Sequence, residues 1–317
     1  MRKLLSLAIA LASLSTICSA QTITETFGIG ANAFTMDFVT IGNPNNVADT
    51  TGGPNPAGSV AYAYNLGKYE VSRGMIDKAN AAGSLGITMW DMTSFGGNGI
   101  NRPATEISWS EAARFVNYLN TSSGSTAAYK FDGSGNFQLW SSSEAGYNSI
   151  NQFRNSLAKF FLPSTDEWYK AAYGSPNGSW YNYPTGSDNA PTAVAGGTAA
   201  NTAVYNGQTG PADINNAGGL SPYGTMGQGG NVVELTESAF DGINDLATDL
   251  RELRGGSWFF SAADMNSLDR ESYLAISSTS LYIGLQGFRV ASVPEPSALS
   301  LLAAGLGGLA LLRLRRS

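Results

Sequence analysis

The sequence has no histidine and a single cysteine, Cys18. The lack of histidine excludes a Ser-His-Asp triad, imidazole acid–base catalysis and histidine-ligated zinc or iron. Cys18 lies in an apolar stretch near the N-terminus. Once that stretch is removed, the chain has no disulfide, no thiolate nucleophile and no thiolate metal site.

Charged side chains are also scarce, at 13% of the residues. When residues 1–20 and 293–317 are set aside, 13 basic and 23 acidic side chains remain. An acidic chain of this kind disfavours nucleic acid as a partner, because phosphate contacts need clustered Lys and Arg. It suits cation binding and solubility outside the cell. The roughly 270 residues between the two ends suffice for one large domain or two small ones.

The first 20 residues have the layout of a secretory signal. Arg2 and Lys3 precede an apolar run, which ends in the small residues Ser19 and Ala20. We predict cleavage by signal peptidase after Ala20. A buried first helix or a membrane anchor is disfavoured because the run is short and a polar segment follows it. Lipid attachment at Cys18 is disfavoured because Ile17 precedes it, where a small residue is usual.

The C-terminal 25 residues also have three parts. A stiff segment, Val293-Pro294-Glu295-Pro296, precedes the apolar stretch Ala298–Leu312, and Arg313, Arg315 and Arg316 follow. The stretch makes about 22 Å of helix, which is a marginal span for a hydrocarbon core of about 30 Å. The arginines would remain on the cytoplasmic side. They also argue against a buried C-terminal helix.

This order of motifs resembles a PEP-CTERM sorting signal. The resemblance covers residues 293–317 and rests on Pro294, Glu295, Pro296 and the terminal arginines. It implies recognition by an exosortase-type sorting enzyme, with transient membrane anchoring through the tail. The expected location is the cell surface or the exterior.

Between the two ends, local signals predict three helices and several short strands. Capping boxes at Ser108-x-x-Glu111 and Ser164-x-x-Glu167 mark two helix starts, and the first helix begins near Ser72. The apolar faces of the helices are Met75, Ile76 and Ala79; Ala112, Phe115, Val116 and Leu119; and Trp168, Ala171 and Ala172. Strands are predicted as a pair within 21–60 and at 61–71, 232–236, 253–260 and 288–292. The loop-rich stretch 174–230 between them favours an α+β fold with much irregular structure.

Six segments resemble, in order, the motifs of the formylglycine-generating enzyme (sulfatase-modifying factor) domain. They are Tyr69-Glu70-Val71-Ser72, Pro103-Ala104-Thr105-Glu106-Ile107-Ser108-Trp109, Leu162-Pro163-Ser164-Thr165-Asp166-Glu167-Trp168, Gly230-Asn231-Val232-Val233-Glu234-Leu235, Leu253-Arg254-Gly255-Gly256-Ser257-Trp258 and Gly287-Phe288-Arg289-Val290. The resemblance places the domain at 61–292, after N-terminal strands and a loop at 21–60.

The resemblance implies a fold and a cofactor. The expected fold is α+β and C-type-lectin-like, with a small twisted antiparallel sheet, a few helices and long loops. The expected cofactor is calcium, held by Asn231, the carbonyl of Val232 and Glu234. A looser match places a second site near 201–214, with Asp213 as its carboxylate. Amide, carbonyl and carboxylate oxygens are the ligands that calcium takes. The alternative is that Asn231 caps a turn and Glu234 is a solvated strand residue.

The sequence departs from the family at its catalytic positions. The oxidases of the family bind copper through two cysteines, and the corresponding positions here are near Phe260 and Met265. A related branch uses iron held by histidines, which this chain lacks. We therefore expect no copper, iron or zinc and no catalysis of either kind, because a shared fold does not imply a shared function.

Three functions remain open. The first is a non-catalytic, calcium-stabilised binding module for exopolysaccharide or another surface ligand, with Trp180, Tyr181, Asn182 and Tyr183 as the contacts. The rings among them are alternatively core residues under the long loop. The second is an enzyme that uses the carboxylates Asp264, Asp269 and Glu271, which are alternatively a solvated acidic loop. The third is a purely structural surface or biofilm-matrix protein.

Overall fold

The structure, a computed structural model, describes residues 22–274 and 284–294. The predicted signal at 1–20 lies outside these residues, as do Glu295, Pro296, Arg313, Arg315 and Arg316. Pro294 is described and is exposed. Within the described ranges, no helix is both long enough and apolar enough to span a bilayer.

One antiparallel sheet joins the two ends of the described chain. Its strands are β1 (Thr22–Phe27), β2 (Phe34–Ile41), β3 (Tyr64–Gly67), β6 (Phe160–Phe161) and β13 (Ala291–Ser292), in the order β1-β2-β3-β13-β6. The predicted early strand pair is therefore confirmed as β1 and β2. Because β2 pairs with β3, the residues expected to precede the domain form part of its sheet.

A second sheet has the order β11-β10-β9-β12. Its strands are β9 (Val233–Ala239), β10 (Leu250–Arg254), β11 (Glu271–Leu274) and β12 (Gln286–Phe288). β12 runs parallel to β9, unlike the antiparallel pairing that we expected. Short two-stranded ribbons are formed by β4 (Lys130–Phe131) with β5 (Phe137–Gln138) and by β7 (Thr192–Ala193) with β8 (Thr202–Ala203).

The three predicted helices are confirmed. They are α1 (Arg73–Gly83), α2 (Trp109–Ser122) and α3 (Thr165–Tyr173), with η1 (Gly30–Asn32), η2 (Thr93–Phe95) and η3 (Ala262–Met265) as short 3-10 turns. Ser108 and Ser164 each accept a hydrogen bond from the backbone of the glutamate three residues later, and that carboxylate accepts one in return. These side chains satisfy backbone groups that would otherwise lack partners at the helix starts.

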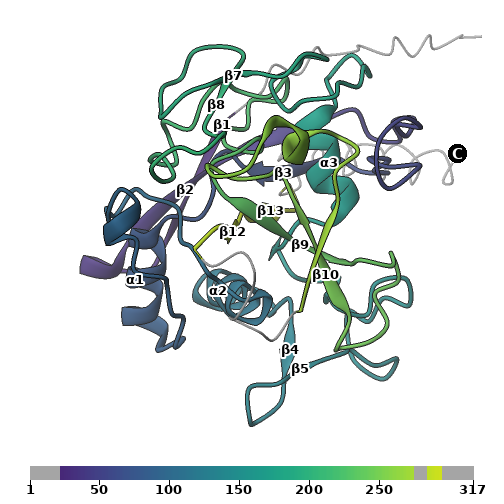
Figure 1. The fold of residues 1–317 in the computed structure, drawn as a ribbon. Helices are drawn as coiled ribbons and strands as arrows, with labels where there is room; N and C mark the ends of the chain where they lie inside the picture. Colours follow the sequence, from purple (N-terminus) through teal and green to yellow (C-terminus); the bar gives the residue numbers. More distant parts are fainter. Residues whose placement is uncertain (1–21, 275–283, 295–317) are drawn as a thin grey trace, which may run out of the picture.

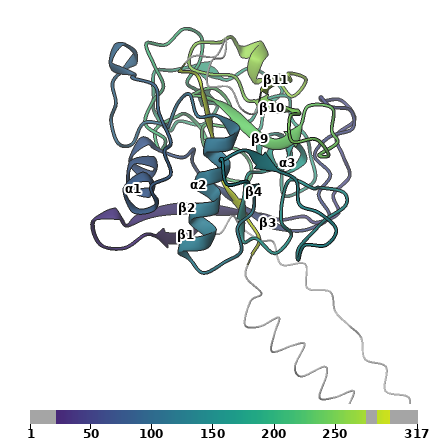
Figure 2. The same ribbon diagram turned by 90° about the horizontal axis from the view of Figure 1, so that it is seen from below.

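The main core lies where α1 and α2 pack against both sheets (Figures 1 and 2). It includes Phe34 and Phe38 of β2, Phe115 of α2, Leu235 of β9 and Phe288 of β12. The long loop region that bears β7 and β8 lies at the top of Figure 1, above the sheets. This arrangement places the loops after β8 and after β10 next to each other.

Three strands are shorter than the sequence predicts, and the one expected at 61–71 is reduced to β3. The strand expected at 253–260 ends at Arg254, because Gly255 and Gly256 adopt φ values of 98° and 64°. A Cβ on Gly255 would lie 2.6 Å from the carbonyl oxygen of Gln228, so a side chain does not fit there. The strand expected at 288–292 is divided between β12 and β13, which belong to different sheets.

Candidate functional site

The loop that follows β10 carries Phe260 and Met265, the positions at which the resemblance places two cysteines. The backbone N–H groups of 206–208 donate to the carbonyls of 258–260, at 2.7–3.2 Å. Met265 is fully buried beside Tyr205, and Phe260 packs against the main core. Both positions are therefore occupied by apolar side chains that stabilise the loop.

Three aromatic rings form a surface beside this loop, which we call the Trp258 face: Phe95, Trp258 and Phe259. The Trp258 ring centroid lies 5.5 Å from that of Phe95 and 5.6 Å from that of Phe259. Phe259 is 59% exposed and Phe95 39% exposed, whereas Trp258 is only 5% exposed. The buried indole N–H of Trp258 has no acceptor among the described residues. Phe95 was not predicted from the sequence, because no local signal links it to Trp258.

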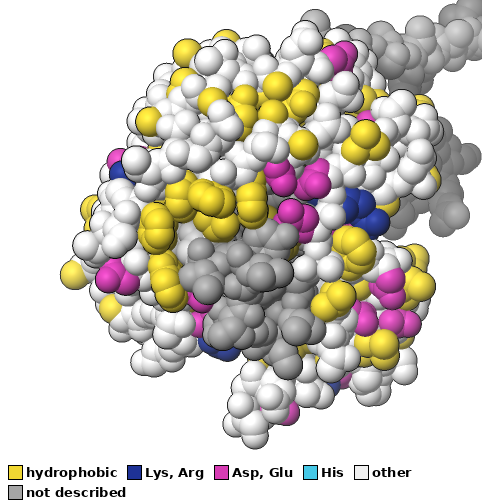
Figure 3. Space-filling model, in the orientation of Figure 1, with side chains coloured by type: hydrophobic (Ala, Val, Ile, Leu, Met, Phe, Trp, Pro, Cys, Tyr) yellow, Lys and Arg dark blue, Asp and Glu magenta, His cyan; other side chains and the backbone are white. Residues whose placement is uncertain are grey.

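Acidic side chains follow in the same loop, and hydrophobic and acidic groups lie side by side on the face that carries β10 (Figure 3). The Asp264 carboxylate accepts hydrogen bonds from the backbone and the hydroxyl of Ser261, which makes it a local cap. Burial raises the pKa of Asp269 to about 6, and the negative charges of Glu271 and Asp264 add to the effect. The three predicted carboxylates thus lie close enough to interact.

The predicted calcium ligands Asn231 and Glu234 are fully buried. The side-chain oxygen of Asn231 accepts from the backbone N–H of Ala212 at 2.8 Å, and its amide nitrogen donates to both carboxylate oxygens of Glu70 at 2.9 Å. The Glu234 carboxylate accepts from Nε and Nη2 of Arg289, at 2.6 and 2.5 Å, and from the indole of Trp168 at 2.6 Å.

These contacts do not fit a calcium ion at Asn231 and Glu234. Calcium takes six to eight oxygen ligands, but here the oxygens face N–H donors and the Arg289 guanidinium. Across residues 22–274 and 284–294, no three or more acidic side chains gather as a metal-binding group. The alternative interpretation of Glu234 as a solvated strand residue is wrong, because the side chain is 0% exposed. Asn231 does occupy a turn, with φ of 58°.

The looser calcium position lies nearby. Asp213 follows Ala212, which bonds Asn231, so the two predicted segments are adjacent in space. The Asp213 carboxylate lies 3.4 Å from Nε of Arg102, and its side chain is 45% exposed. Calcium at Asp213 stays a prediction of the resemblance.

Chelation tests calcium directly. Because Arg289 and Trp168 already occupy the Glu234 carboxylate, we expect excess EGTA to change the unfolding temperature of the chain by less than about 2 °C. A larger fall in the unfolding temperature would show that the folded chain binds calcium. In that case Asp213→Asn would decide the site, since it should abolish the effect of EGTA if Asp213 is a ligand.

The predicted sugar contacts lie in two separate clusters. The Trp180 ring is 5.6 Å from that of Tyr169 and packs with α3, whereas Tyr183 packs with the cluster around Tyr205. Tyr181 is half-buried, and its backbone N–H donates to the carbonyl of Tyr173. Asn182 is exposed, and its carbonyl accepts from the backbone of Ser267. These four residues therefore connect the long loop to the domain rather than forming one open platform.

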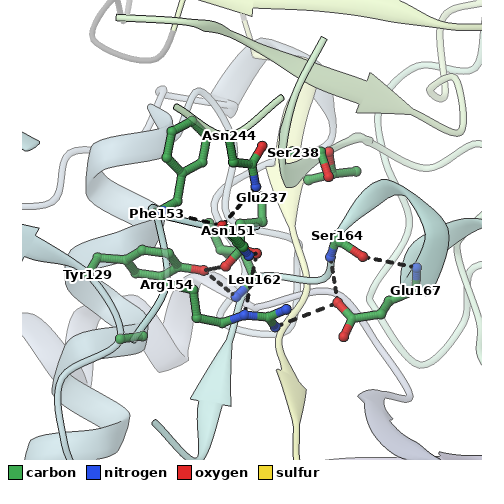
Figure 4. A network of polar contacts seen from close by, with 12 residues as sticks. Tyr129, Asn151, Phe153, Arg154, Leu162, Ser164, Glu167, Glu237, Ser238 and Asn244 are labelled. Atoms are coloured by element: carbon green, nitrogen blue, oxygen red, sulfur yellow. Dashed lines mark hydrogen bonds and ion pairs between the residues drawn. The ribbon is translucent and has the colours of Figure 1, made fainter. Parts of the chain in front are cut away.

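A second buried network, centred on Arg154, was not predicted (Figure 4). Arg154 Nε lies 3.4 Å from a carboxylate oxygen of Glu237, and Nη1 lies 3.7 Å from one of Glu167. The hydroxyl of Tyr129 donates to Glu237 at 2.8 Å, and the amide of Asn151 donates at 2.6 Å. This network joins α3, β9 and the loop before β6, so its role is to hold the fold together.

Comparison with known proteins agrees with this fold. Residues 27–293 match the family model of the sulfatase-modifying factor enzyme 1-like domain. The chain belongs to this family. No curated protein matches the chain. The match includes β2 and the loop after it, so the family domain extends further towards the N-terminus than residue 61.

Solved structures of similar fold include variable protein 1 of Treponema denticola, at 20% identity and a TM-score of 0.57, covering 86% of this chain and 99% of that one. CarF has 18% identity and a TM-score of 0.55, with 82% and 99% covered. PvdO from Pseudomonas aeruginosa has 15% identity and a TM-score of 0.52, with 85% and 98% covered. At these identities the likeness shows the fold of the sulfatase-modifying factor family and nothing about activity.

Proposed function

We propose that this chain is a non-catalytic binding protein that acts outside the cell, with the Trp258 face as its ligand-binding surface. The proposal includes export by the predicted signal and sorting tail. The observation that carries it is the pairing of an exposed ring, Phe259, with a buried N–H donor on Trp258 that has no acceptor in the described part of the chain. The apolar side chains of Phe260 and Met265, at positions assigned to catalytic cysteines, support binding rather than oxidation.

A carbohydrate suits the chemistry of this face. The C–H groups of a sugar ring pack against aromatic rings, while its hydroxyl oxygens accept from an indole N–H. A buried donor without a partner costs about 1–3 kcal/mol, so a movement of the loop that brought this N–H to a ligand oxygen would recover part of that cost. We therefore propose an exopolysaccharide-type glycan as the ligand.

The test is a glycan-array screen followed by calorimetry with the best ligand. Phe259→Ala should weaken binding about tenfold or more, because it removes an apolar contact worth about 1.5 kcal/mol. Its unfolding temperature should not change, since the side chain is mostly exposed. The matched control is Ile150→Ala, which removes an 89% exposed apolar side chain from the loop between β5 and β6 and should leave binding unchanged.

Other outcomes of the same screen separate the competing functions. If no glycan binds, or if Phe259→Ala binds as tightly as the wild type, the Trp258 face is not the site, and a structural matrix role gains support. An enzyme remains a second candidate because Asp269 has a pKa raised to about 6, as general acids often do. Cleavage of the bound glycan that Asp269→Asn abolishes would establish that function instead.

A further inference from the structure

β1 is an open edge of the first sheet, at the margin of the ribbon in Figure 2. All six of its residues pair with β2 in one continuous register, without a bulge. Within the described residues, the backbone groups of 22–27 form no hydrogen bond to any other segment. An edge of this kind presents unpaired N–H and C=O groups to any strand that arrives.

This edge lacks most of the usual protection against pairing, and its one core-facing charge, Glu25, is held in an ion pair. Natural edge strands carry lysine, proline, bulges or inward-pointing charges that prevent association. The β1 sequence TITETF has no lysine and no proline. Its one charged side chain, Glu25, lies 3.1 Å from the ammonium of Lys159. The exposed side chains are Thr22, Thr24 and Thr26, whose β-branched shape favours extended structure.

We propose that a second copy of this chain pairs with β1, antiparallel across a two-fold axis, with Thr24 opposite Thr24 of the second copy. The pairing is isologous, so each residue meets its partner twice. In this register Thr22 lies opposite Thr26 of the other copy, and the exposed face becomes a ladder of threonine pairs. Cross-strand pairs of this kind each contribute about 0.2–1 kcal/mol.

Strand length and charge together select this register, because only the registers centred on Thr24 and on Glu25 overlap along nearly the whole strand. The register centred on Thr24 places Glu25 opposite Ile23 of the second copy, whereas a register centred on Glu25 would set two carboxylates face to face, which is destabilising. The hydroxyl of Thr24 also donates to Asp37 of β2 at 2.6 Å. The two Asp37 carboxylates would be separated by three strand spacings, about 14 Å, which exceeds the screening length of about 10 Å at 0.1 M salt.

The self-complementary strand also explains why the partner is a second copy. A strand of another sequence would need its own match to the threonine face, whereas β1 matches itself in one register. A six-residue pair buries far less than the roughly 1,600 Å² of a standard interface. The dimer is therefore weak and forms at high local concentration.

Disulfide trapping tests the register. In the full chain with Cys18→Ser, Thr24→Cys should form a covalent dimer under mild oxidation, since opposed residues of antiparallel strands have Cα atoms about 4.5–5.5 Å apart, within disulfide range. The control is Ser134→Cys, on the exposed turn between β4 and β5, which reports random collision. Thr24→Cys should cross-link about tenfold faster or more, because pairing raises the effective concentration of the thiols.

Mixed samples sharpen the result. Ile23→Cys mixed with Glu25→Cys should give the heterodimer, and neither variant alone should cross-link faster than Ser134→Cys. Rapid self-cross-linking of Glu25→Cys, or equal rates for Thr24→Cys and Ser134→Cys, would overturn the proposal. Without cysteines, Thr24→Lys should shift the sedimenting species at high concentration to the monomer, and Thr24→Val should not. A dimer that Thr24→Lys leaves intact would also overturn it.

Discussion

Replacing Glu234 by glutamine should lower the free energy of unfolding by about 3–5 kcal/mol, which is the usual cost of leaving one member of a buried ion pair uncompensated. Both side chains are fully buried, and the Glu234 carboxylate is the only acidic group within 4 Å of Arg289 in the described chain. Arg289 also donates to the carbonyls of Gly67 and Met226. Loss of the ion pair should therefore weaken contacts to both sheets, because Gly67 belongs to β3 and Glu234 to β9. Urea unfolding of the purified chain measures the change in free energy.

Glu25→Gln is the matched control for this substitution. Glu25 is also a strand glutamate in an ion pair, but its side chain is 31% exposed, and its partner Lys159 is 20% exposed. Exposed pairs contribute about 0–1 kcal/mol, so this variant should unfold almost as the wild type does. Equal losses for the two variants would show that the Glu234–Arg289 pair is not buried as described.

Glu70 provides a contrast within the same network. Burial raises the pKa of Glu70 well above its usual 4.5, and the charge of Glu234 raises it further. Between pH 4.5 and the pKa of the folded state, the folded chain therefore holds a proton on Glu70 that the unfolded chain has released. The stabilisation from this group is complete below pH 4.5 and is lost as the pH rises through the pKa of the folded state. Removing the charge at Glu70 should accordingly destabilise the protein far less than removing the charge at Glu234.

Elements with local signals were predictable from the sequence. Ser108 and Glu111 are three residues apart, and their capping box needs no tertiary contact to be recognised. The polar segment at 21–60, with Gly, Asn, Pro and Thr concentrated at 42–58, likewise predicted a strand pair and a loop, and the pair is β1 and β2. The ends of β10 were not predicted, because the aromatic residues at 258–260 suggest that the strand continues, whereas Gly255 and Gly256 turn the chain before them. The parallel pairing of β12 with β9 joins segments that are far apart in the sequence, so no short sequence pattern could predict it.

The candidate site was harder to predict than the fold. The family motif around Asn231 and Glu234 was recognised, but its role depends on Arg289 and Glu70, which are distant in the sequence. The ion pairs of Arg154 could not be predicted for the same reason, because its partners Glu167 and Glu237 lie in α3 and β9, far from it in the sequence. The Trp258 face brings η2 together with the loop after β10. Such contacts follow from the complete fold and not from spacing.

Replacing Arg154 by methionine should lower the free energy of unfolding by about 3–5 kcal/mol at neutral pH, because Glu237 and Glu167 would then remain buried without a cation. Burial raises the pKa of Glu237, and Arg154 lowers it. Without Arg154 this pKa rises further, so the folded variant binds a proton more readily than the unfolded chain does. The deficit relative to the wild type should therefore shrink as the pH falls, which urea unfolding between pH 5 and pH 8 would measure.

Arg251→Met is the control that separates charge pairing from packing. Both arginines lie close over a phenylalanine ring: Arg154 is 3.9 Å from the centroid of Phe161, and Arg251 is 4.0 Å from that of Phe153. No carboxylate among the described residues lies within 4 Å of Arg251, and burial lowers the pKa of Arg251 to about 10. Methionine fills a similar volume without the cost of a buried charge, so this variant should lose less than about 2 kcal/mol and show no such pH dependence. If both variants lost equal stability at every pH, packing alone would account for Arg154.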